Sequence, residues 1–168
     1  MVIFMNFNVD GMNVRKIFSN FLIFGDKIEP TMIVEDIKEL DSDYLDVLKE
    51  SGIKGLIVDV DETLREMFHK VPEENIEWLS LAKSKMKVAV VSNGYNTQIR
   101  EILEQLDIPY FDFAFKPLKI NINKALDSMD ITGEESLFIG NSQLTDMLGG
   151  YRVGSKLCKV KKNKQSNR

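Results

Sequence analysis

The chain has 168 residues, of which 43% are hydrophobic, so one globular domain is predicted and a disordered or fibrous chain is excluded. Its 26 acidic side chains outnumber the 22 basic ones, which argues against broad nucleic-acid binding. A single cysteine, Cys158, excludes a disulfide framework and predicts a reducing, cytoplasmic location. No apolar run approaches the roughly 20 residues that a membrane-spanning helix needs.

The two ends of the chain differ in composition from its middle. Residues 1–25 form an aromatic and apolar segment, and the absence of a basic flank at its start argues against a secretory signal. Residues 162–168 form a basic tail, whose commoner meaning is a solvated terminus and whose alternative is contact with an anionic membrane. We therefore predict one domain over residues 26–161.

The N-terminal segment has two interpretations. Its apolar residues fit a helix that packs on the core of the domain. Alternatively, Phe18, Phe21 and Phe24 share one helical face and could enter the interface of a bilayer. The sequence leaves both interpretations open.

From residue 53 onward, apolar runs alternate with amphipathic stretches. The runs show no polar alternation, which is typical of strands that are buried on both faces of a parallel sheet. They cover residues 53–60, 87–92, 110–115, 136–140 and 156–160.

The intervening stretches are predicted to be helices. Pro72 suits the first turn of one helix, and Asn96 and Asp41 are N-caps of two others. Further helices are expected around residues 121–129 and 143–148. This alternation predicts an α/β fold with a doubly wound, Rossmann-like parallel sheet.

The first strong apolar run ends in two carboxylates, Asp59 and Asp61, within the sequence DVDETL. In an open α/β sheet the carboxyl ends of the strands line the ligand crevice. Two carboxylates there are costly to desolvate unless a cation or a proton compensates, and Mg²⁺ prefers such oxygen ligands. A metal-assisted phosphoryl site is one interpretation, and a strand-to-loop turn capped by aspartate is the other.

The other apolar runs also end in polar residues. Ser92 and Asn93 follow the second run, at a position where a hydroxyl and turn amides can hold phosphate oxygens. Lys116 follows the third run and could neutralise phosphate charge, while Asn141 and Asp146 follow the fourth. Polar clusters at the same end of four successive strands favour the phosphoryl site over the capped turn.

These motifs resemble those of the haloacid dehalogenase-like (HAD) phosphatases of subfamily IIIA, and more closely the YqeG type. The resemblance rests on the sequences GIKGLIVDVDETL, VAVVSNGYN, IPYFDFAFKPL and LFIGNSQLTDMLGGYRVG. It implies a phosphatase in which Asp59 is the nucleophile that forms an aspartyl-phosphate and Asp61 is the general acid and base. It also implies that Thr63 braces the nucleophile loop within a phosphate-binding set completed by Ser92, Asn93 and Lys116.

The resemblance further implies a Mg²⁺ cofactor, held by the Asp59 side chain, the Asp61 carbonyl, Asn141 and Asp146. The position of Asn141 is normally an aspartate in this family, and an amide oxygen supplies no charge to the metal. Two interpretations follow: a slower phosphatase with a greater need for metal, or a binding or regulatory scaffold with little or no turnover.

The segments after the first and third apolar runs are too short for a folded cap domain, so a capless, open site is expected. An open site favours a large or surface-bound phosphomonoester. The YqeG-type resemblance includes phosphatases that act on phosphatidylglycerophosphate, a membrane lipid. That substrate would place the protein transiently at the inner face of the membrane, whereas another phosphomonoester would leave it in the cytoplasm.

Overall fold

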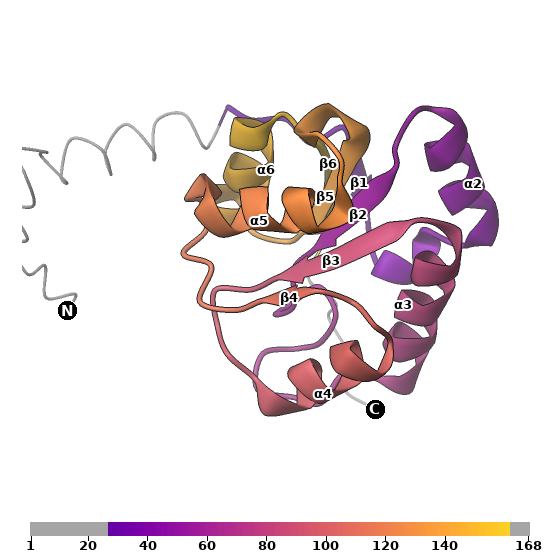
Figure 1. The fold of residues 1–168 in the computed structure, drawn as a ribbon, viewed down its shortest axis with the longest axis vertical. Helices are drawn as coiled ribbons and strands as arrows, with labels where there is room; N and C mark the ends of the chain where they lie inside the picture. The colour runs from indigo at the N-terminus through magenta and orange to yellow at the C-terminus, as the bar shows by residue number, and fades with distance from the viewer. Residues whose placement is uncertain (1–26, 162–168) are drawn as a thin grey trace, which may run out of the picture.

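The computed structural model describes residues 27–161 (Figure 1). The predictions for residues 1–25 and for the basic tail lie outside the described residues. Within residues 27–161 the chain forms one sheet with helices on both faces, as the sequence predicts.

The sheet has six parallel strands in the order β1-β6-β5-β2-β3-β4. The strands are β1 (Met32–Val34), β2 (Gly55–Val58), β3 (Lys87–Val91), β4 (Tyr110–Phe111), β5 (Ser136–Gly140) and β6 (Lys156–Val160). All positions of β2 and β5 are buried, which explains why these runs lack polar alternation. The doubly wound parallel fold is confirmed.

The helices lie in two layers (Figure 1). Leu56 and Val58 of β2 pack in one core cluster with α2, α3 and α4, whereas Ile57 faces the cluster that contains α5. This alternation follows from the period of two in a strand. The helices are α2 (Ser42–Glu50), α3 (Glu73–Lys85), α4 (Thr97–Gln105), α5 (Lys119–Met129) and α6 (Leu148–Val153), with short turns η1 (Ile37–Glu39), η2 (Gly133–Glu135) and the π-helical η3 (Gln143–Met147).

Two of the predicted helix caps are confirmed. Asp41 accepts a hydrogen bond from Tyr44 N and Asn96 accepts one from Ile99 N, so each satisfies a free amide at the start of its helix. Pro72 lies one residue before α3 instead of in its first turn.

Three elements differ from the prediction. The strand expected over residues 110–115 is only two residues long, because Phe113 and Phe115 adopt positive φ angles, which interrupt the extended backbone that a strand needs. Strand β1 was not predicted, since a three-residue strand gives almost no periodic signal. The helix expected over residues 143–148 starts as the π-helical turn η3 and continues as α6.

The thiol of Cys158 lies in the core on β6. Burial raises its pKa to about 12, with a smaller contribution from the charge of Glu39. Because the thiolate is the reactive form, we expect no alkylation of the folded protein by iodoacetamide at pH 8 and full alkylation in urea. Mass spectrometry measures both, and rapid labelling of the folded protein would contradict this placement.

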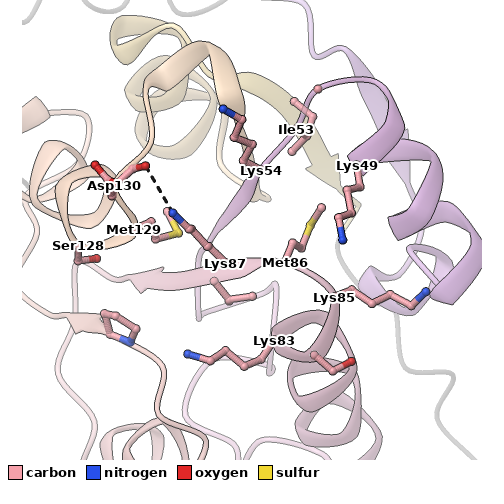
Figure 2. Close-up of a pocket in the computed structure, with 14 residues that line it drawn as sticks. Lys49, Ile53, Lys54, Lys83, Lys85, Met86, Lys87, Ser128, Met129 and Asp130 are labelled. Atoms are coloured by element: carbon pink, nitrogen blue, oxygen red, sulfur yellow. Dashed lines mark hydrogen bonds between the residues drawn. The ribbon is translucent and has the colours of Figure 1, made fainter.

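A hollow of about 840 Å³ lies where the strands begin (Figure 2). Its lining includes five lysines, Lys49, Lys54, Lys83, Lys85 and Lys87. Lys83 Nζ donates to Asp107 O at 2.5 Å and Lys87 Nζ donates to Asp130 O at 3.5 Å, and these carbonyls follow the last turns of α4 and α5. Lysines are favoured at helix C-termini because they complement the helix dipole. Two of the five lysines therefore contact helix ends, and Lys54 and Lys85 pair with Glu135 and Asp46.

Candidate active site

The predicted site residues gather at the opposite edge, where the strands end. Strand β2 lies between β3 and β5, so the order of the chain reverses there, and ligands bind at such a switch point in open α/β sheets. A cavity of about 270 Å³ opens at this place. Its lining contains Asp59, Asp61, Ser92, Asn93, Lys116, Asn141 and Asp146, that is, all the predicted site residues except Thr63.

The ammonium group of Lys116 lies at the base of the cavity between two carboxylates. Its Nζ is 2.5 Å from Asp59 Oδ1 and 2.7 Å from Asp146 Oδ1, and it also donates to Val91 O at 2.9 Å. The side chains of Lys116 and Asp146 are each 1% exposed and that of Asp59 is 10% exposed. One buried cation is therefore shared by two buried anions.

This sharing leaves the charge at the base unbalanced. Burial and the charge of Asp146 raise the pKa of Asp59 to about 7, and Lys116 opposes that shift only in part. Burial would lower the pKa of Lys116, but the charges of Asp146 and Asp59 raise it above its ordinary value. Lys116 is therefore the fixed positive charge, and a further cation would stabilise the ionised carboxylates.

The π-helical turn η3 holds Asp146 against the end of β5. Asp146 Oδ2 accepts a hydrogen bond from Ser142 N at 3.0 Å. Gly140 makes the close packing possible, because a Cβ atom there would lie 2.5 Å from the Cβ of Asp146. Such π-helical turns are frequent at functional sites.

Two of the predicted phosphate-binding residues make contacts that position the others. Thr63 Oγ1 donates to Asp59 Oδ2 at 3.2 Å and lies behind the cavity. The side chain of Asn93 is bonded to the backbone of Lys116 on both sides, accepting from its N at 2.6 Å and donating to its O at 3.2 Å. Ser92 Oγ accepts from Gly94 N at 3.1 Å and lines the cavity.

The carboxylate of Asp61 is held by a residue that the sequence analysis missed. Arg65 Nε and Nη2 lie 2.9 and 2.8 Å from Asp61 Oδ1, and the Arg65 side chain is only 8% exposed. Between the two residues the chain turns through Glu62, at φ 63°, and pairs in an isolated bridge. Because this pair forms within a loop, no helical or strand periodicity could have revealed it.

The donor set fits a hard divalent cation. Asp59 and Asp146 supply carboxylates and Asn141 supplies an amide oxygen at the same cavity. Mg²⁺ is usually bound through one or two carboxylates together with waters and phosphate oxygens. Within residues 27–161 there is no group of three His, Cys, Asp or Glu side chains placed to hold a metal, and Asn141 adds a neutral side chain to the lining of the cavity.

Three exposed phenylalanines lie close in the sequence to residues that line the cavity. Phe68 follows the lining residue Met67, and Phe115 precedes Lys116; their exposed fractions are 90% and 68%. Phe113 is 55% exposed and stacks on Tyr95 with 6.1 Å between ring centroids. All three phenylalanines have positive φ angles, an uncommon conformation for bulky residues. The loops thus hold large apolar side chains in water beside the site.

Comparisons with known proteins give a family match and a related protein. The profile of the haloacid dehalogenase-like hydrolase family matches residues 11–160. The Bacillus subtilis (strain 168) protein named "Probable phosphatase YqeG" is 38% identical over 109 residues, which cover 64% of this chain and 63% of that protein. This chain therefore matches less than two thirds of the length of that relative.

Solved structures show the same fold. A HAD family enzyme from Bacteroides thetaiotaomicron, in a magnesium complex, has a TM-score of 0.54 and 12% identity, covering 68% of this chain and 96% of its own. The 3-deoxy-D-manno-octulosonate 8-phosphate phosphatase from Yersinia pestis has a TM-score of 0.51 and 16% identity, covering 70% and 77%.

Proposed function

The chain belongs to the haloacid dehalogenase-like hydrolase family, and from this premise we propose that it is a Mg²⁺-dependent phosphomonoesterase that acts through an aspartyl-phosphate. The observation that carries the proposal is the buried Lys116 ammonium shared by Asp59 and Asp146 at the base of an open cavity. That arrangement combines a carboxylate nucleophile, a cation for phosphoryl oxygens and a surplus of negative charge for a metal.

In the proposed reaction, a carboxylate oxygen of Asp59 forms a bond to phosphorus while the bond to the leaving oxygen breaks. Asp61 transfers a proton to that leaving oxygen, and later removes a proton from the water that hydrolyses the aspartyl-phosphate. Lys116 and the Ser92 hydroxyl bind phosphoryl oxygens. Thr63 and Lys116 each hold one oxygen of Asp59 and so fix the orientation of its carboxylate.

Mg²⁺ would be held by Asp59, Asp146, Asn141 and the Asp61 carbonyl, and when bound it would neutralise charge on the transferring phosphoryl group. Phosphoryl transfer needs mainly positioning and charge neutralisation from the protein.

A hydrolysis assay tests the proposal. The full chain is incubated with a panel of phosphomonoesters, and inorganic phosphate is measured with Mg²⁺ and with EDTA. We expect Mg²⁺-dependent release from at least one ester. Retained Mg²⁺ binding without release from any ester would favour the alternative function, a binding scaffold that has lost turnover.

The neutral Asn141 gives a separate prediction about metal affinity. We expect the Asn141→Asp variant to bind Mg²⁺ at least about tenfold more tightly than the unaltered protein, because a carboxylate adds Coulomb attraction to the ion. Calorimetric titration measures the difference. Asn123→Asp adds the same charge on the exposed surface of α5 and should leave the affinity unchanged. Equal affinities of Asn141→Asp and the unaltered protein would place residue 141 outside the metal shell.

For the substrate, we propose a lipid phosphate such as phosphatidylglycerophosphate. The support is the open cavity, which has no cap over residues 59–72 or 112–118, and the exposed Phe68, Phe113 and Phe115 beside it. Aromatic side chains at a polar surface can enter the interface of a bilayer. None of the helices in residues 27–161 is long and apolar enough to cross a membrane.

Sedimentation with liposomes tests the lipid proposal. The protein should bind vesicles that contain anionic lipid. Binding should weaken with salt, because salt screens exposed charges. It should also weaken after removal of residues 161–168, because their basic side chains would attract the anionic surface. Phe68→Ser with Phe115→Ser should weaken it further, whereas Val47→Ser, an exposed apolar change on α2, should not. A protein that stays in solution with anionic vesicles at low salt would favour a soluble phosphomonoester.

A further inference from the structure

The turn after β2 places a buried guanidinium against the carboxylate of Asp61. Both Arg65 contacts, from Nε at 2.9 Å and Nη2 at 2.8 Å, are made to the same oxygen, Oδ1. A third nitrogen, Nη1, donates to His69 O at 3.1 Å. The guanidinium group of Arg65 is therefore held by both Asp61 and His69. It contacts only one of the two carboxylate oxygens of Asp61.

The second oxygen of Asp61 faces the phosphate-binding loop. A Cβ atom built on Gly94 would lie 3.7 Å from Asp61 Oδ2 and 3.9 Å from Ser92 Oγ. Gly94, Ser92 and Asp61 all line the cavity. Oδ2 is thus directed into the space where the reacting phosphomonoester would lie, on the same side as the Ser92 hydroxyl.

We propose that Arg65 is the positioning residue of the general acid: by holding Oδ1 it fixes the Asp61 rotamer and presents Oδ2 as the oxygen that exchanges the proton with the leaving group. This inference rests on the proposed phosphatase function. In the transfer, the proton on Oδ2 moves to the leaving oxygen as its bond to phosphorus breaks. The Asp61 side chain is 29% exposed even with the fork in place, so without the fork it would be able to turn toward water.

Apart from the bond to His69 O, the backbone hydrogen bonds of the turn do not involve the Arg65 side chain. Glu62 N donates to Arg65 O at 2.6 Å, and Arg65 N donates to Val60 O at 3.2 Å. Removal of the guanidinium would therefore leave these turn bonds in place, and the partly exposed Asp61 carboxylate can be solvated. We expect Arg65→Met to fold, with a circular dichroism spectrum like that of the unaltered protein.

The test compares two substrates that differ in their need for an acid. Phenyl phosphate has a poor leaving group that needs a proton as it departs. The leaving group of p-nitrophenyl phosphate departs as a stable phenolate and needs no proton. We expect Arg65→Met to lower kcat/KM for phenyl phosphate by about tenfold to a hundredfold and for p-nitrophenyl phosphate by less than about threefold. Arg65→Lys, which keeps the charge and loses the fork, should recover part of the loss.

A double-mutant cycle separates positioning of Asp61 from general support of the loop. If Arg65 acts through Asp61, then Arg65→Met adds no further loss in an Asp61→Asn background. Lys70→Met removes an exposed cation from the same loop and should leave both substrates unaffected. Equal losses on both substrates, or losses that add in the double variant, would overturn the proposal.

A structural measurement keeps the inference independent of the activity. If the unaltered protein hydrolyses neither aryl ester, these two substrates do not report on the acid, and crystal structures of the unaltered and Arg65→Met proteins then decide the role of Arg65. We expect Asp61 to change rotamer in the variant and Oδ2 to leave its place beside Gly94. An Asp61 side chain that keeps its position without Arg65 would overturn the inference.

Discussion

Replacing Asp59 by asparagine should abolish turnover while leaving the fold intact. An amide cannot form the acyl-phosphate, so we expect kcat to fall by at least about a thousandfold, as for loss of a covalent nucleophile. The fold should survive because Lys116 keeps a carboxylate partner in Asp146, at 2.7 Å.

The surroundings of Asp59 predict the sign of the stability change. Burial and the charge of Asp146 raise the pKa of Asp59, so its ionised form is unfavourable where it lies. The neutral amide of Asp59→Asn removes that cost, and we expect the free energy of unfolding in EDTA at pH 7 to be unchanged or slightly higher. A large loss of stability would mean that the Asp59–Lys116 pair holds the site together.

The measurement combines kinetics with chemical trapping. The unaltered protein is mixed with substrate, quenched and reduced with borohydride, and the modified residue is located by mass spectrometry. We expect modification at Asp59 and none in Asp59→Asn. Asp127→Asn, on the exposed surface of α5, is the matched control and should behave like the unaltered protein. Substantial activity in Asp59→Asn would exclude the covalent mechanism.

The position of the site could be predicted from sequence because parallel strands end at one edge of the sheet. The apolar runs gave the strands, and the residues that follow them, such as Asp59 and Lys116, therefore had to converge. Their exact pairing was not predictable, since the sharing of one ammonium by Asp59 and Asp146 depends on how deeply the side chains are buried.

The loop contacts could not be predicted for a different physical reason. Arg65 reaches Asp61 because the chain turns at Glu62, a residue with positive φ that is not glycine and so carries no turn signal. The side chain of Asn93 reaches the backbone of Lys116 across 23 positions of sequence. Both contacts depend on loop conformation, which hydrophobic periodicity does not describe.

Lys116→Met should produce the largest loss of stability of any single substitution at the site. It leaves Asp59 and Asp146 facing each other without their cation, and the side chain of Asp146 is 1% exposed. Removing one partner of a buried ion pair costs about 3–5 kcal/mol, because the remaining charge stays desolvated. We expect a loss of that size in the free energy of unfolding, measured in urea at pH 7 with EDTA present.

A second substitution shows whether the unpaired carboxylates cause the loss. Asp146→Asn in the Lys116→Met background removes one buried charge and its repulsion of Asp59, so part of the lost stability should return even though another native residue has been changed. Lys119→Met removes an exposed lysine from the start of α5 and should cost less than about 0.5 kcal/mol. A Lys116→Met variant as stable as Lys119→Met would contradict the prediction, because loss of the shared ammonium group would then cost the folded protein nothing.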